Sequence, residues 1–218
     1  MRMHLFGLIH KGIRHILNTR VLQLGQLDLR SVADIKSQSD EVRQSFEVLH
    51  AHAAGEEEFV FPYVEESDLD LFNRLMHDHQ EFTHIMDSIE GQVKALVADE
   101  ERIIKGYDIT QALNDFVAKY SAHMLVEEKM AAPILWAAAT DSQIGEIIGK
   151  ISMKAKPEVR LYFLHYLIQA TNPMERIGVL SGMKTLMPTA VFQGALQVTQ
   201  KALSTKDWEA LRHALEQS

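Results

Sequence analysis

The chain of 218 residues contains no cysteine. Disulfides, zinc–thiolate sites and cysteine-ligated iron–sulfur clusters all require cysteine sulfur, so the sequence excludes all three. No apolar run approaches the roughly 20 residues that a membrane-spanning helix needs. The first residues also lack the apolar segment and small-residue cleavage site of a secretory signal. We therefore expect a cytoplasmic protein that does not associate with membranes.

Positive charge is scarce as well. Twenty-two Lys and Arg residues face 30 Asp and Glu residues, which gives a formal net charge of −8 at pH 7. This acidic excess argues against nucleic acid and anionic lipid surfaces as partners. The apolar fraction of 46% and charged fraction of 24% are ordinary for a globular protein. The length suits one large domain, or one domain with a smaller appendage.

Histidine is what the sequence does contain, and six of its eleven histidines recur at equivalent positions. Residues 52–62 and 123–133 both begin with His, carry two acids four and five residues later, and end in Pro. Four residues of α-helix turn the chain by about 400°, so each His and its first Glu project from one face about 6 Å apart. That face can offer an imidazole nitrogen and a carboxylate oxygen to one metal ion, or to two adjacent ions.

A further histidine segment precedes each copy of this motif. Aligning His10 with His79 also aligns Ile13 with Phe82 and His15 with His84. From His10 to His52 is 42 residues, and from His79 to His123 is 44. The chain therefore has the pattern of a duplicated unit, in which a helix with one His is followed by a helix with His-x-x-x-Glu.

Apolar residues at helical spacing predict an all-α protein, since no strand-like alternation bounded by turns interrupts them. Gly25 is expected to end the first helix and Pro62 to kink or end the second. A Gly-Tyr-Asp sequence at 106–108 is expected to separate the third helix from the fourth. Four helices with short connections favour an up-down-up-down bundle over residues 1–140. The predicted helices span residues 4–25, 31–66, 69–98 and about 106–139.

Residues 141–218 have a different pattern, in which prolines recur every 15 or 16 residues. Pro157, Pro173 and Pro188 each stand where a helix would begin. We expect four or five short helices there, forming a C-terminal appendage that carries no recognisable chemical motif. Its apolar residues should cover the bundle surface or make a homodimer contact. They include Tyr162, Phe163, Tyr166 and Leu167.

The doubled motif favours a metal site over a set of surface ion pairs. A single His-x-x-x-Glu is most often a solvated pair on a charged helix. Two matched copies, each with its own histidine segment, place imidazoles and carboxylates on faces that a bundle buries. Such groups cost several kcal/mol unless they are paired or coordinated. The mixed nitrogen and oxygen set suits iron or manganese, and zinc by raw affinity.

These blocks resemble the hemerythrin-like, HHE cation-binding family, whose members hold a non-haem di-iron centre inside a four-helix bundle. The resemblance covers about residues 4–139. It implies two iron ions (Fe²⁺ or Fe³⁺) that an oxo or hydroxo group can bridge, with manganese and zinc as alternatives. The metal ligands it implies are His10, His52, Glu56, His79, His123 and Glu127.

The sequence also departs from the oxygen-carrying members of that family. Those proteins use five histidines and two carboxylates, with two histidines four residues apart on the third helix. Here Leu75 and Thr83 stand four residues either side of His79. His15 and His84 are alternative extra ligands, although a position five residues after a ligand is rotated by about 140° and favours packing.

Three further residues lie close to the proposed ligands in sequence. Glu57 and Glu128, the second acids of the motif, are about 100° from the ligand face. We expect them to meet solvent or a basic side chain, with a hydrogen bond to a ligand as the alternative. Tyr120 shares the face of His123 and is expected to be a core tyrosine. A hydrogen bond from its phenol near the metals is the alternative.

The ligand count indicates what such a centre could do. If both glutamates bridge, four imidazoles and two carboxylates supply eight of about twelve positions around two six-coordinate ions. The remaining positions can take water, hydroxide or a diatomic ligand. One hypothesis is binding or sensing of oxygen or nitric oxide, and another is an enzyme that reduces peroxide or nitric oxide or handles iron. A metal-stabilised interaction module is the third. The absence of cysteine argues against the iron–sulfur repair role of some family members.

Overall fold

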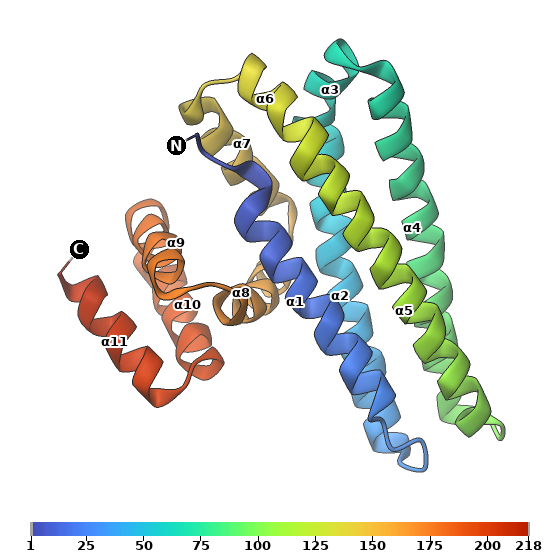
Figure 1. Cartoon of the computed structure of the whole chain (residues 1–218). Coiled ribbons are helices and arrows are strands. Elements are labelled where there is room, and N and C mark those ends of the chain that lie inside the picture. Colours follow the sequence, from blue (N-terminus) through green and yellow to red (C-terminus); the bar gives the residue numbers. More distant parts are fainter. Residues whose placement is uncertain (1, 218) are drawn as a thin grey trace.

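The computed structural model describes residues 2–217, which form helices and no strand. Four long helices make the bundle: α1 (Leu5–Gly25), α2 (Val32–Phe59), α4 (Leu69–Ala95) and α5 (Arg102–Val126). Each packs against two others, α1 and α4 both contacting α2 and α5. Figure 1 shows the four as nearly parallel rods. The predicted all-α four-helix bundle is confirmed.

Local sequence explains where these helices begin and what they bury. Ser31 accepts a hydrogen bond from the backbone N–H of Asp34, and Asp68 accepts one from Leu71, so each caps a helix N-terminus. Apolar residues at three- and four-residue spacing form one face of each helix and meet in a continuous core. That core includes Ile13, Ile16, Leu17, Val42, Phe46, Leu49, Phe82, Met86, Leu113, Phe116 and Tyr120.

The two prolines of the repeated motif interrupt both ligand-bearing helices just after the motif. Helix α2 ends at Phe59, and α3 (Phe61–Ser67) begins with Pro62 in its first turn. Helix α5 passes into a π-helical turn, Glu127–Ala131, before α6 (Ala132–Ala138) begins with Pro133 in its first turn. A proline has no N–H to donate to the preceding turn, so regular α-helix cannot continue through it. The sequence prediction that Pro62 ends or kinks the second helix is confirmed.

The predicted break at residues 106–108 is wrong. Gly106 lies inside α5, and the chain leaves α4 through a 3-10 turn, Leu96–Ala98, before α5 begins at Arg102. A Cβ atom on Gly106 would lie 2.5 Å from Cδ1 of Leu29 in the connection between α1 and α2. The glycine therefore permits a close approach between two segments rather than a turn of the chain.

Residues after Thr140 form five short helices within the described part of the chain (Figure 1). Thr140, Asn172 and Ser204 cap the N-termini of α7, α9 and α11, and Pro157 and Pro173 are the first residues of α8 and α9. The positions predicted for helix starts are therefore confirmed. The helices are α7 (Asp141–Lys154), α8 (Pro157–Ala170), α9 (Pro173–Leu186), α10 (Thr189–Ala202) and α11 (Thr205–Glu216).

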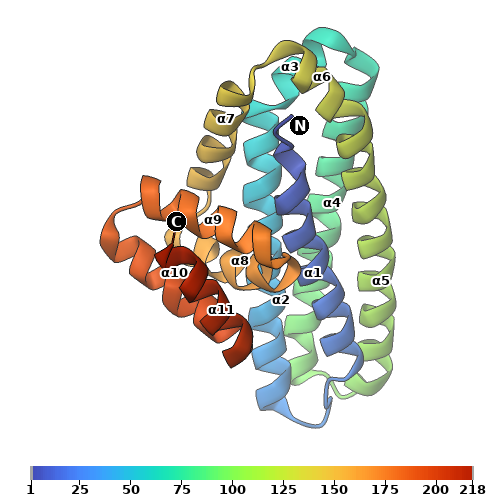
Figure 2. The same cartoon turned by 60° about the vertical axis from the view of Figure 1, so that its left-hand side comes forward.

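These helices cover one face of the bundle. Helix α7 packs on α2, and α8 crosses α1 and α2, as Figure 2 shows. Val159 and Tyr166 of α8 are part of the main core. Helices α9 to α11 share a smaller core with α8, formed by Leu164, Ile168, Leu180, Ala195, Leu211 and Leu215. No helix within residues 2–217 is long and apolar enough to cross a membrane.

Candidate metal centre

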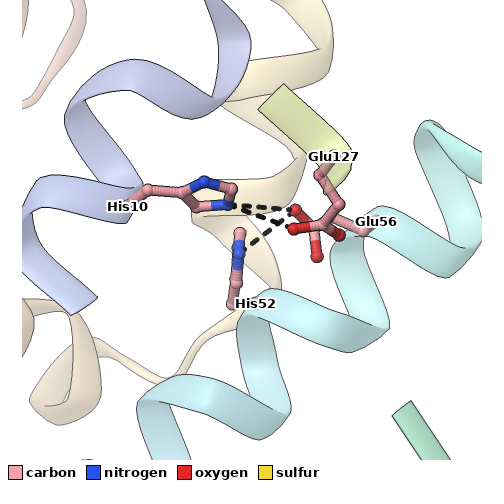
Figure 3. Close-up of side chains that lie close together, drawn as sticks. All are labelled: His10, His52, Glu56 and Glu127. Carbon is pink, nitrogen blue, oxygen red and sulfur yellow. Dashed lines mark ion pairs between the residues drawn. The ribbon is translucent and has the colours of Figure 1, made fainter. Parts of the chain in front are cut away.

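The six proposed ligands converge from four helices. Helix α1 contributes one histidine, α2 a histidine and a glutamate, and α4 and α5 one histidine each, while the last glutamate opens the π-helical turn. Figure 3 shows the imidazole rings from α1 and α2 directed at the two carboxylates. Each of the six is no more than 5% exposed: His10, His52, Glu56, His79, His123 and Glu127.

Each carboxylate lies between two pairs of imidazoles. Oε1 of Glu56 is 3.1 Å from Nε2 of His52, and Oε2 is 3.7 Å from Nε2 of His79. Oε1 of Glu127 is 3.2 Å from Nε2 of His123, and Oε2 is 3.4 Å from Nε2 of His10. One oxygen of each glutamate therefore faces one histidine pair and the other oxygen faces the other pair. Bridging carboxylates need this arrangement.

The donor atoms form two groups that could each hold an ion. One comprises His10, His52, Glu56 and Glu127, and the other comprises His79, His123 and Glu127. Within each group, the candidate ligand atoms lie within 4.8 Å of one another. Glu127 belongs to both groups, so two ions bound here would be neighbours that share a ligand.

Buried polar atoms without partners show that these residues fit metal ions. Among the described residues, the four oxygens of Glu56 and Glu127 make no hydrogen bond, nor do Nε2 of His10 and both ring nitrogens of His52. Leaving such atoms buried without a hydrogen bond costs from one to several kcal/mol each. Coordination to a dication satisfies both the carboxylates and the imidazole nitrogens, and this nitrogen and oxygen set suits iron, manganese or zinc.

The electrostatics also favour a bound cation. Burial and the negative charge of Glu127 raise the pKa of Glu56 well above its usual value. Burial opposes ionisation of Glu127 too, but His123 outweighs it and lowers the pKa of that carboxyl. Burial lowers the pKa of His52, which keeps its imidazole neutral and able to ligate. A bound cation would offset the negative charge that two ionised glutamates bring into this buried site, and would therefore favour the ionised form of Glu56.

The second acids of the motif meet ligand histidines of neighbouring helices. Nδ1 of His10 donates to Oε1 of Glu128 at 2.8 Å, and Nδ1 of His79 donates to Oε1 of Glu57 at 2.9 Å. Arg14 also donates to Glu128 at 2.8 Å. Solvent or a basic side chain was the favoured expectation for Glu57 and Glu128, and it is incomplete. The alternative, a hydrogen bond to a ligand, holds for both residues. The rotation of about 100° brings each acid within reach of the adjacent helix, while the Glu57 side chain also stays 39% exposed to solvent.

Asp78 plays the same part and was missed from the sequence. Its Oδ2 accepts a hydrogen bond from Nδ1 of His123 at 3.0 Å. Although burial opposes the charged imidazole, Glu127 and Asp78 together raise the pKa of His123 to about 9. The available signal was its position directly before His79, which turns it about 100° from the ligand face, as far as Glu57 and Glu128 but in the opposite direction. A carboxylate on Nδ1 fixes the tautomer that presents Nε2 to a metal.

The alternative ligands lie outside the cluster. His84 is exposed on α4, and Nε2 of His15 lies 3.0 Å from Oε1 of Gln169 in α8. The rotation of about 140° between a ligand and the residue five positions later explains why both point away from the cluster. Tyr120 is buried, with its ring centre 6.0 Å from that of His123. Burial and the charges of Glu56 and Glu127 raise the pKa of its phenol, which therefore stays protonated near neutral pH.

Comparison with known proteins identifies the family of this chain. No curated protein and no solved structure matches the chain. The family model described as the hemerythrin HHE cation-binding domain matches residues 3–135, which include the bundle and all six converging side chains. Together with the buried His and Glu cluster, this match identifies a hemerythrin-like metal-binding protein. The chain belongs to the hemerythrin family of HHE cation-binding domains.

Proposed function

We propose that this protein holds two iron ions in the bundle and that the centre binds or reacts with oxygen, nitric oxide or peroxide. The observation that carries the proposal is the placement of Glu56 and Glu127, each with one oxygen toward each histidine pair. The proposed ligands are these two glutamates with His10, His52, His79 and His123. Two bridging carboxylates and four imidazoles supply eight of about twelve coordination positions, so small ligands have room to bind.

Each group of protein side chains has a distinct task in this proposal. The two glutamates would hold both ions and offset their charge. The outer carboxylates, which are those of Glu57, Asp78 and Glu128, orient three of the imidazoles through hydrogen bonds from Nδ1. Phe6, Phe61 and Phe82 pack their rings on His10, His79 and His123 at centroid distances of 5.1, 5.0 and 5.3 Å. These rings limit the access of water. Bound iron supplies a Lewis acid and a one-electron redox couple to a small ligand.

The ligand set favours reaction over reversible oxygen storage. The oxygen carriers of the family use five histidines, and this chain offers four within the cluster. One more position is therefore exchangeable. We infer that the reduced centre is oxidised by oxygen instead of releasing it intact.

A second candidate function is a metal-stabilised interaction module. Helices α8 to α11 share an apolar core of their own, and α8 lies on α1, the helix that carries His10. In that case the metal would stabilise the bundle and the C-terminal helices would contact a partner protein. A second copy of this chain is one such partner.

Metal analysis tests the metal content. After reconstitution with ferrous iron, we expect two iron ions per chain, and Glu127→Ala should lose most of them because it removes a ligand common to both positions. His213→Ala is the matched control, since His213 is an exposed residue of α11 that contacts Gln217. A wild-type content of one ion or none contradicts the proposal, as does equal loss in His213→Ala.

Stopped-flow spectroscopy tests the chemistry. Anaerobically reduced protein is mixed in turn with oxygen, nitric oxide and hydrogen peroxide, and its absorbance is followed. We expect oxidation by oxygen within minutes and no recovery of oxygen under vacuum. A long-lived product that releases oxygen under vacuum would establish an oxygen carrier. No spectral change with any of the three reagents would favour the interaction module.

A further inference from the structure

The four histidines of the cluster are not supported equally. Nδ1 donates to a carboxylate in three of them: His10 to Glu128, His79 to Glu57 and His123 to Asp78, at 2.8 to 3.0 Å. Nδ1 of His52 is buried and makes no hydrogen bond within residues 2–217.

The internal repeat shows where this difference arises. Aligning His10 with His79 and His52 with His123 makes Glu57 equivalent to Glu128, and these two acids hold equivalent histidines. The same alignment places Ile9 at the position of Asp78. In one half of the bundle the residue before the first histidine supplies an acceptor to the next helix. In the other half an isoleucine that packs on the main core stands in its place and supplies none.

The aromatic contacts also support His123 more than His52. Phe82 lies edge-on to His123 with the ring centres 5.3 Å apart. The equivalent residue in the first half is Ile13, and the ring contact that the structure gives His52 is with His10. His52 therefore lacks both the hydrogen bond and the aromatic contact that orient its counterpart.

The missing acceptor affects metal affinity. A carboxylate on the outer nitrogen of a ligand histidine fixes the ring and raises the basicity of the ligating nitrogen, and its removal typically lowers metal affinity about 10- to 100-fold. A metal bound to Nε2 of His52 would leave a buried N–H with no acceptor.

The positions of the carboxylates alone favour the opposite order, because Glu56 lies nearer to His10 and His52 than to His79. A Glu side chain adjusts by such a distance through its own torsions. No torsion supplies a missing hydrogen-bond acceptor at Ile9.

We propose that the two metal positions are unequal, and that the position of His79 and His123 binds its ion more tightly than the position of His10 and His52. Because Ile9 stands where the other half has an acid, the position of His10 and His52 is the weaker of the two. This inference rests on the two-metal centre proposed above and adds an order of occupation to it.

Anaerobic calorimetric titration of the metal-free full chain with ferrous iron tests the order directly. We expect two binding events per chain whose dissociation constants differ about 10- to 100-fold. A total of one ion or none overturns the two-metal proposal itself. Two ions bound with equal affinity overturn only the inequality.

Two variants assign the difference to its cause. Ile9→Asp should tighten the weaker event about 10-fold and bring the two together, and a merely structural role of Ile9 would not increase affinity. Asp78→Ile should weaken the tighter event by a similar factor. Because Asp78 is partly exposed, this variant remains informative if Ile9→Asp does not fold.

The matched controls are Ile104→Asp and Asp87→Ile, which make the same exchanges at exposed positions on α5 and α4. They should leave both events unchanged. If Asp78→Ile weakens neither event, or if the controls reproduce either effect, the inequality does not arise from the outer carboxylates and the proposal is wrong.

Discussion

A single missing side chain at position 12 lets α8 lie directly on α1. A Cβ atom on Gly12 would lie 2.7 Å from Cε2 of Phe163, closer than nonbonded carbon atoms approach. The C-terminal helices therefore depend on a glycine two residues after His10. The sequence indicates the helix here, but nothing local distinguishes this glycine from one that faces solvent.

Substitution of this glycine should therefore lower stability, although alanine is the better helix former. We expect Gly12→Ala to destabilise the fold by about 1–3 kcal/mol, because the Phe163 ring must move out of a packed interface. Gly91→Ala is the control, since a Cβ there meets nothing within 4 Å. That change within α4 should stabilise by about 0.5–1 kcal/mol. Urea unfolding midpoints measure both, and shifts of the same sign would contradict the packing argument.

At the scale of elements, a buried arginine joins three helices. Arg20 of α1 is fully buried, and its Nη1 lies 2.7 Å from Oε2 of Glu41 on α2. Its Nη2 donates to the hydroxyl of Tyr166 on α8. The hydroxyl of Tyr162 donates to the same carboxylate of Glu41 at 3.0 Å. The contact between bundle and C-terminal helices is thus polar as well as apolar.

Arg20→Ala should lower the free energy of unfolding by about 2 kcal/mol or more, since it opens space in the core and removes the donor to Tyr166. Arg43→Ala removes an arginine from the solvent face of α2, where Arg43 pairs with Glu47 at 2.7 Å. Surface pairs of that kind contribute at most about 1 kcal/mol. Denaturant titrations compare the two variants. Equal losses would show that the contacts of Arg20 with α2 and α8 stabilise the fold no more than a surface ion pair does.

In the complete chain, the metal-binding bundle and the C-terminal helices share one core. Every proposed ligand lies before residue 141, yet Val159 and Tyr166 belong to the main core and Ile151 packs against the position of Gly55. The bundle therefore contains all six proposed ligands, but part of its apolar core is buried only by the C-terminal helices.

We predict that a chain ending at Thr140 still binds metal but unfolds more easily. The loss of two buried side chains from the main core alone should remove about 3 kcal/mol or more of stability. Iron analysis and circular dichroism of this fragment, with the full chain as control, check both statements. A fragment that is soluble, helical and metal-free would contradict the division at residue 140.

The sequence alone determined the features that depend on local geometry. The 3.6-residue period places His52 with Glu56 and His123 with Glu127 on single helix faces, whatever surrounds them. The prolines at 62 and 133 interrupt their helices because the missing N–H acts within one turn. The duplicated spacing then predicted that both faces meet inside one bundle.

The contacts between side chains of different helices follow from the packing of the fold and not from local sequence. The partners of the ligand histidines, Glu128 for His10 and Asp78 for His123, lie on neighbouring helices 118 and 45 residues away in sequence. The close contacts of Gly12 and Gly106 likewise involve segments remote in the chain. Helical period fixes the direction of a side chain from its own axis. What that side chain touches depends on the rotation and separation of the next helix, which the packing of the whole core sets.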